Sequence, residues 1–445
     1  MIFSDINYVF LVFLPFCFVA VFDHYFPAYN VVKSYVIIAL SVVYYYYGPA
    51  ADIVIFAIFV LGNYLILRLA GENRQLILLL ASLNVFALFA IKATFPNGAP
   101  LAISFIAFQI VGLMITQLRT GGELPTIKAY LFFLVFFPQM VAGPILHWNW
   151  VKGFLRRWEQ GVVIRPAVEY ALLFLAAGLS KKVLIADRLQ PPVNMLQSTD
   201  TVVGLVDAVI FPFMYAMYLY FDFSAYSDIA VGTAALIGLR LPINFYSPYK
   251  ARNPSVFWRR WHRTLHKFLS NDLRYIYNYF NLPKKMWFVL FIFLFSGFWH
   301  GAGLGFFLWA VGHFFYFVFY PKKIFRKLPL VLSVGLNFVI VSLLWIPFAL
   351  DANGLLRWLK GVLAIFDGIF LSEGWYYNSL TNIVDLKVVI IGILIVFIMP
   401  NSFELARSSK YWFAKRLLII LGLFLPISLM LAGVEAPRAF TYFQF

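Results

Sequence analysis

Long apolar stretches without a charged residue set the strongest limit on how this 445-residue chain can fold. A helix that spans a bilayer needs about 20 mostly apolar residues, and a barrel strand would alternate apolar and polar residues. These stretches are continuous, and lipid offers no partner to exposed backbone groups. We therefore predict an all-α polytopic membrane protein with about 11–14 transmembrane and re-entrant helices. The stretches are 34–51, 53–67, 75–91, 93–118, 129–151, 286–321 (long enough for two segments), 328–350, 388–403 and 417–434.

Composition supports the same class of protein. Hydrophobic residues make up 63% of the chain and charged residues 12%, whereas soluble domains are about half apolar and a quarter charged. The net charge is +16. Because the cations flank apolar stretches, they favour cytoplasmic anchoring and attraction to anionic lipid over nucleic-acid binding. Cys17 is the only cysteine, so neither an intrachain disulfide nor a thiol metal site is expected.

The charged segments between the apolar stretches predict the orientation of the chain in the membrane. Residues 250–285 carry nine Lys or Arg against one acid, and smaller basic clusters lie at 152–157 and 322–327. The positive-inside rule places these segments on the cytoplasmic side. The more acidic stretch 351–386 is expected on the opposite face. Residues 6–22 lack the features of a removed signal peptide and are interpreted as the first retained span. No internal repeat or linker divides the chain, so we expect one domain over 1–445.

His300 is the clearest candidate for chemistry. No charged residue lies within ten positions on either side, and Gly301, Gly303 and Gly305 follow it. Glycines weaken a helix and allow close backbone approach, and a broken helix at membrane depth is tolerated where it lines a cavity. We therefore predict that His300 faces a pocket. His313 lies about 20 Å further along an unbroken helix, although a bend at the glycines would bring the two closer. Two histidines that only form interhelical hydrogen bonds remain the alternative, above all for His313.

The segment NPSVFWRRWHRTLHKFLSNDLRYIY, residues 253–277, predicts one amphipathic helix at the interface with a cationic stripe. His262 and His266 are four residues apart and share a face of such a helix. No acidic ligand accompanies them, so a metal site is not expected. The segment is either a basic surface helix or a proton carrier, His262, beside cations that hold the phosphates of an acyl donor.

Two further segments carry polar residues within apolar surroundings. Asp222 and Asp228 lie in YLYFDFSAYSDIAVG, residues 218–232. They either cap a helix break together with Ser224, or orient a histidine or bind a hydroxylated substrate. The segment FFPQMVAGPILHW, residues 136–148, predicts an irregular re-entrant turn in which His147 is structural.

Seven segments together resemble the membrane-bound O-acyltransferase family, in the branch that contains alginate O-acetylation and teichoic acid D-alanyl transfer proteins. They occur in the family's order and cover nearly the whole chain. Two segments depart from the pattern: residues 271–287 are shorter than the loop of alginate-type members, and the glycines after His300 are more numerous than usual. The seven segments are 83–93, 103–109, 136–145, 220–232, 243–265 (INFYSPYKARNPSVFWRRWHRTL), 296–302 (SGFWHGA) and 442–445.

The resemblance implies a helical bundle around a central tunnel, with His300 as the catalytic histidine. His262 falls at the family's second polar functional position, often Asn, Asp or His, and His313 matches a further histidine common in this branch. No metal and no tightly bound cofactor are expected. The remaining candidates for supporting or substrate-binding roles are Asp222, Asp228, Arg259, Arg260, Trp261 and Trp299.

The resemblance also implies transfer of an acyl group, foremost acetyl, from a cytosolic thioester to a hydroxyl. The donor would be acetyl-CoA or an acyl carrier protein. The acceptor would be an exopolysaccharide or cell-wall polymer, reached directly or through an extracytoplasmic partner protein, at the bacterial cytoplasmic (inner) membrane. Transfer of D-alanine to teichoic acid is the alternative within the family. A transporter or flippase with structural histidines is the alternative from another class.

Overall fold

The computed structural model describes residues 9–25, 30–46, 52–94, 102–122, 124–160, 162, 167–197, 203–282, 286–363, 366 and 383–431. Within these ranges every regular element is a helix, which confirms the predicted class. Six helices are long and apolar enough to cross a membrane, and five shorter apolar helices accompany them, so the chain is a multi-pass membrane protein. Residues 6–8, half of the acidic stretch 351–386 and the motif at 442–445 lie outside the described residues.

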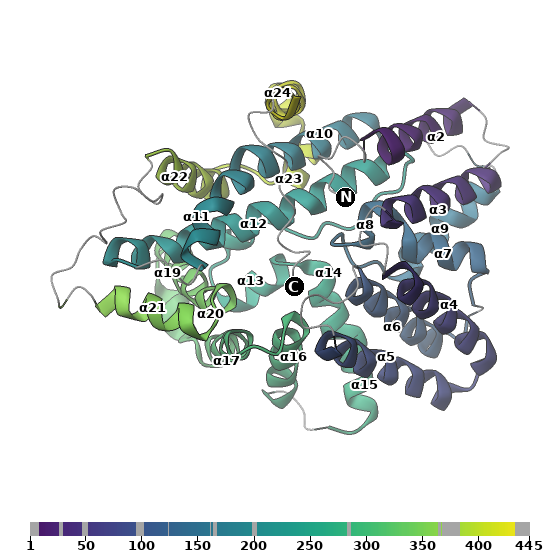
Figure 1. The fold of residues 1–445 in the computed structure, drawn as a ribbon, viewed down its shortest axis with the longest axis horizontal. Coiled ribbons are helices and arrows are strands. Elements are labelled where there is room, and N and C mark those ends of the chain that lie inside the picture. Colours follow the sequence, from purple (N-terminus) through teal and green to yellow (C-terminus); the bar gives the residue numbers. More distant parts are fainter. Residues whose placement is uncertain are drawn as a thin grey trace.

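The first helices pack side by side at the right of Figure 1, and they differ in how much of their surface the protein covers. They are α2 (Leu14–Tyr25), α3 (Asn30–Tyr46), α4 (Asp52–Ala70), α5 (Arg74–Thr94) and α6 (Ile103–Thr120). Of the spanning windows, that of α6 is 78% buried, against 22% for α4 and 28% for α5. The apolar side chains of α4 and α5 therefore face lipid, whereas α6 belongs to the interior.

Helix α12 (Leu205–Ala235) runs through the middle of the molecule, with α10 (Val168–Leu179) along it (Figure 1). Small residues bring the two backbones together: a Cβ at Gly232 would lie 2.8 Å from the carbonyl oxygen of Ala171. Such packing is common where lipid removes the hydrophobic drive for helix association. Because α12 continues unbroken through residues 222–228, no helix break exists there for Asp222 and Asp228 to cap.

The prediction of a single interfacial helix over 253–277 is wrong. The segment forms α13 (Pro254–Arg260), α14 (Arg263–Lys267), the π-helix Phe268–Leu273 and α15 (Arg274–Tyr279). His262 interrupts it with a φ of 43°. The break has a tertiary cause: Tyr246 N–H donates to the carbonyl of Arg260, and Arg263 N–H donates to that of Asn244, at 3.0 and 2.8 Å.

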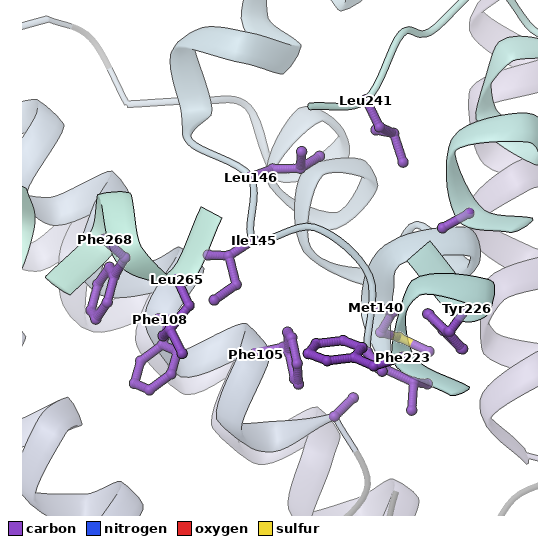
Figure 2. Close-up of a cluster of buried hydrophobic side chains, with 14 of the residues drawn as sticks. Phe105, Phe108, Met140, Ile145, Leu146, Phe223, Tyr226, Leu241, Leu265 and Phe268 are labelled. Atoms are coloured by element: carbon purple, nitrogen blue, oxygen red, sulfur yellow. The ribbon is translucent and has the colours of Figure 1, made fainter. Parts of the chain in front are cut away.

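The apolar side of the broken segment is buried in protein, whereas the predicted cationic side chains of Arg259, Arg263 and Lys267 are exposed. Leu265 is 7% exposed and Phe268 fully buried. In Figure 2 both side chains pack beside Phe105 and Phe108 of α6 in one apolar cluster. Surrounding helices therefore cover the apolar side of the segment, a contact that the local pattern of residues could not specify.

The stretch 286–321 forms two helices, as predicted. They are α16 (Met286–His300) and α17 (Leu304–Phe319), separated by Gly301–Gly303. The chain continues through α18 (Lys322–Lys327), α19 (Leu330–Leu344), α20 (Ile346–Ala349) and α21 (Ala352–Leu363). A Cβ at Gly305 would lie 2.6 Å from the carbonyl oxygen of Leu350 and closer still to that of Pro347. The glycine thus allows the start of α17 to touch the backbone after α20, as the sequence predicted for this cluster of glycines.

The remaining elements surround these helices. The stretch 136–148 is largely irregular, as predicted, with the short α8 (Phe137–Met140) between α7 (Ile127–Val135) and α9 (Trp148–Glu159), and most of its residues are buried. The π-helix Ser180–Ala186 joins α10 to α11 (Asp187–Gln197). The C-terminal elements are α22 (Ile383–Ile398), α23 (Ser402–Arg407) and α24 (Trp412–Leu431).

Candidate active site

A cavity of about 140 Å³ lies where α12, α13, α14, α16, α17 and α20 meet. His262, from the break between α13 and α14, and His300, from the last position of α16, both line it. Most of the remaining wall is apolar or aromatic. The aromatic lining side chains include Trp258, Trp261, Trp309, Trp345, Phe293 and Phe348.

Aromatic rings fix the position of His300. Its ring centre lies 4.7 Å from that of Phe348, in an edge-to-face arrangement, and 5.8 Å from that of Trp309. Phe306 stacks on it with ring centres 6.1 Å apart. The side chain is half-buried. These contacts hold the imidazole against the cavity, at the point where the glycines end α16.

His262 is more deeply buried, with 4% of its surface exposed. Its Nδ1 lies 3.0 Å from Oδ1 of Asn244. The ring of Phe223 packs edge-to-face on it with centres 4.8 Å apart, and that of Phe105 lies 6.3 Å away. Figure 2 shows both rings in the apolar cluster between α6 and α12. Burial in these surroundings lowers the pKa of His262 to about 3, so its imidazole is neutral at pH 7.

His313 lies behind the cavity wall. It is fully buried in α17, with ring centres 4.9 Å from Trp258 and 5.2 Å from Trp309. Among the residues that the structure describes, neither ring nitrogen has a hydrogen-bond partner. The interhelical hydrogen bonds considered from the sequence are therefore not formed within the described part of the chain. His313 supports the indole rings that face the cavity.

Asp222 and Asp228 lie apart from the cavity wall and pair with lysines. Asp222 Oδ1 lies 2.8 Å from Nζ of Lys182, and Asp228 Oδ2 lies 2.6 Å from Nζ of Lys181. Asp228 also accepts a hydrogen bond from the hydroxyl of Ser402. A buried carboxylate is stable only when it is paired and hydrogen-bonded. These contacts account for both carboxylates without a histidine or a substrate.

The remaining residues predicted to support the site or bind substrate lie in different places. Trp261 is 5% exposed and lines the cavity, whereas Trp299 is buried nearby against Phe108, with ring centres 5.3 Å apart. Arg259 lines an adjoining groove. The guanidinium of Arg260 instead lies over the ring of Tyr246, 5.9 Å from its centre.

The adjoining groove is larger, at about 930 Å³, and strongly basic. His266 lines both the cavity and the groove, so the two hollows adjoin at this side chain. Burial and the charges of Arg259 and Arg274 lower the pKa of His266. Among the described residues that line the groove, Glu169 is the one acid. The lining cations are Arg240, Arg259, Arg263, Lys267, Arg407 and Lys415.

Sequence reasoning missed part of this arrangement. Arg240, Arg407 and Lys415 lie outside the basic segment 250–285, and no local pattern connects them to it. Asn244 contacts His262 directly, although the sequence shows it only as one residue of the motif at 243–265. Among the described residues no group of three or more His, Cys, Asp or Glu could hold a metal ion.

The fold and the site define a class of protein: a multi-pass helical membrane protein in which two histidines share a buried aromatic cavity beside a basic groove. The chain belongs to the membrane-bound O-acyltransferase family, whose sequence profile matches residues 67–328. This confirms the resemblance inferred from its motifs.

Three relatives illustrate the range of the family. A peptidoglycan O-acetyltransferase of Helicobacter pylori is 30% identical over 71% of this chain and 64% of its own length. A probable alginate O-acetylase, AlgI, of Azotobacter vinelandii is 34% identical over 48% of this chain and 43% of its own. A teichoic acid D-alanyltransferase of Bacillus subtilis is 27% identical over 65% of this chain and 79% of its own. The chain thus matches less than two thirds of the length of the first two relatives.

Proposed function

We propose that this protein is an acyltransferase that moves an acyl group, foremost acetyl, from a cytosolic thioester across the membrane to a hydroxyl. The donor is acetyl-CoA or an acyl carrier protein, and no other cofactor is needed. The acceptor is an exopolysaccharide or cell-wall polymer, reached directly or through an extracytoplasmic partner protein. Residues 1–445 act as one domain, surrounded by lipid in a bacterial cytoplasmic membrane.

One observation carries the proposal: His262 and His300 line one cavity, and that cavity adjoins a groove lined, within the described part of the chain, by six cations. Guanidinium and ammonium groups bind phosphate oxygens through charge-assisted hydrogen bonds. The donor's phosphates would lie in the groove, and its thioester would pass His266 into the cavity. The aromatic wall would then exclude water, which would otherwise hydrolyse the thioester.

The residues have distinct roles in the proposed reaction. A hydroxyl is a weak nucleophile at neutral pH, and His300 takes its proton as the oxygen attacks the thioester carbonyl. The new C–O bond forms, the C–S bond breaks, and the thiolate takes the proton from His300 to leave as a thiol. His262 orients the acceptor substrate. Trp261, Trp309 and Phe348 position the reacting groups.

The test is the mass of the extracellular polymer from cells that carry the wild type, His300→Ala or His147→Gln. The His147 ring lies in a separate hollow, with Nδ1 3.4 Å from Asp272, and serves as the histidine control. We expect His300→Ala to insert and fold but to abolish the acetyl mass shift, while His147→Gln retains it. An unchanged acetyl content in His300→Ala would reject the catalytic role.

The polymer mass and two further measurements distinguish the alternative functions. A mass shift of D-alanine, with co-purification of a phosphopantetheine carrier, would assign the acyl group and donor differently within the same family. Flux of a substrate across proteoliposomes without any acyl transfer would favour a transporter or flippase.

A further inference from the structure

We infer that Asn244 is a positioning residue that holds His262 as the Nδ1–H tautomer, so that Nε2 of His262 accepts a hydrogen bond from the acceptor substrate in the cavity, at a group other than the hydroxyl that His300 deprotonates. The inference rests on the proposed function and assigns the direction of one hydrogen bond within it. It concerns Asn244, which lies behind the cavity wall, and His262, which is part of that wall.

Four contacts fix the orientation of the Asn244 amide. The backbone N–H of Thr264 can only donate, and it lies 3.4 Å from Oδ1 of Asn244. The hydroxyl of Thr264 donates to the same oxygen at 2.9 Å, while it accepts from the N–H of Ile145 at 3.0 Å. On the other side, Nδ2 of Asn244 donates to the hydroxyl of Ser227 at 3.3 Å. The atom that faces His262 is therefore the carbonyl oxygen, because a flipped amide would oppose the backbone N–H of Thr264, which can only donate.

The orientation of the amide decides the tautomer of His262. An amide oxygen only accepts hydrogen bonds, so the Nδ1 that lies 3.0 Å from it must carry a proton. A neutral imidazole has one N–H, and the other nitrogen is then an acceptor. Burial keeps the ring neutral, since its pKa is about 3. Nε2 therefore offers a lone pair, and His262 has no second proton with which to polarise a thioester carbonyl.

Asn244 also fixes the backbone that carries His262. A non-glycine residue with φ of 43° lies in the left-handed region, which is unfavourable for a residue with a Cβ. The carbonyl of Asn244 accepts from the N–H of Arg263 at 2.8 Å, immediately after this residue. One side chain and one carbonyl of Asn244 thus hold both the ring and the strained backbone of His262. Such support is what a group needs to act as a defined acceptor in a site.

The direct test is the protonation of His262 in ¹⁵N-histidine-labelled protein in proteoliposomes at pH 7. The chain has six histidines, and the signals of His262 are identified by their loss in His262→Asn. Solid-state ¹⁵N spectra distinguish a protonated from an unprotonated ring nitrogen. We expect Nδ1 to be protonated and Nε2 unprotonated. A protonated Nε2 beside an unprotonated Nδ1 would overturn the inference, whether or not the protein transfers acyl groups.

Two variants test the role of Asn244 and one serves as a control. Asn244→Asp keeps an acceptor opposite Nδ1 and should preserve the tautomer, whereas Asn244→Leu removes it and should let Nε2 become protonated. We expect Asn244→Leu to lower kcat at least tenfold with little change in the KM of the thioester. Ser227→Ala removes only the partner of Nδ2 and should retain the wild-type spectrum and rate. Wild-type kcat in a folded Asn244→Leu would overturn the positioning role. If Asn244→Leu does not fold, the wild-type spectrum still decides the tautomer.

Discussion

Gly305→Ala tests how the cavity is built, because Gly305 lies at the contact between the start of α17 and the backbone at the end of α20. The added Cβ would lie 2.6 Å from the carbonyl oxygen of Leu350, and Cβ atoms essentially never lie closer than 3.0 Å to another atom. The two backbones must therefore separate by about 0.4 Å or more. Phe348, which packs on His300 with ring centres 4.7 Å apart, lies between the two carbonyls that the Cβ would strike.

The expected magnitudes follow from this displacement. Overpacking in a close-packed interior typically costs about 1–3 kcal/mol, and flexible side chains cannot relieve it here because both neighbouring atoms are backbone oxygens. A misplacement of about 1 Å can cost about 10²-fold in rate, so a shift of this size should slow acyl transfer roughly tenfold. Thermal unfolding in detergent and the acetyl content of the polymer measure the two effects.

Gly335→Ala is the matched control for this prediction. Gly335 lies in the apolar helix α19, and a Cβ there would meet no atom within 4 Å. Alanine is the better helix former by about 0.5–1 kcal/mol, so stability should be unchanged or higher. If Gly305→Ala matches Gly335→Ala in both stability and transfer rate, the close approach of α17 to the backbone after α20 does not define the site.

Three further predictions concern charges. Burial lowers the pKa of His262 to about 3, so between pH 6.5 and 3 the unfolded chain binds a proton that the folded chain does not, and stability falls as the pH drops. The free energy of unfolding should change less with pH across this range in His262→Asn than in the wild type. An equal pH dependence of the two proteins would contradict the burial of His262. Arg407→Glu in the basic groove should raise the KM of the thioester roughly tenfold with kcat unchanged. Lys323→Glu, outside the groove, should leave this KM unchanged. Equal KM values for the two variants in steady-state assays would exclude the groove as the donor site. Lys182→Met should destabilise the protein by about 3–5 kcal/mol, because Asp222 would lose a buried cation; Asp222→Asn added to this variant should restore part of that loss in thermal unfolding.

The local sequence was sufficient for some features of the site and insufficient for others. The glycines after His300 predicted both the turn between α16 and α17 and a pocket at this position, because a charge-free stretch with three glycines has few other stable arrangements in lipid. The segment around His262 has an equally clear helical pattern, yet it breaks. Backbone hydrogen bonds from Asn244 and Tyr246 replace those of the helix, and such long-range partners leave no local periodicity.

The two buried aspartates show the same limit. The sequence placed Asp222 and Asp228 within an apolar stretch but left open whether they cap, orient or bind. The answer depends on Lys181 and Lys182, more than 30 residues earlier in the chain, which approach only because α10 and the π-helix after it pack along α12. Pairing with these lysines removes the need for a substrate at either carboxylate.

By itself, the sequence determined the class of structure, because lipid requires each spanning segment to satisfy its own backbone and so to be an apolar helix. It also determined the family, through motifs that keep their order along the chain. Only the tertiary structure decided the chemistry of the cavity: among the described residues, His262 and His300 both line it, cations from residues 240–267 and 407–415 line the groove beside it, and Asn244 sets the proton on His262. These are contacts between residues far apart in the chain, and their distances arise only when the helices pack.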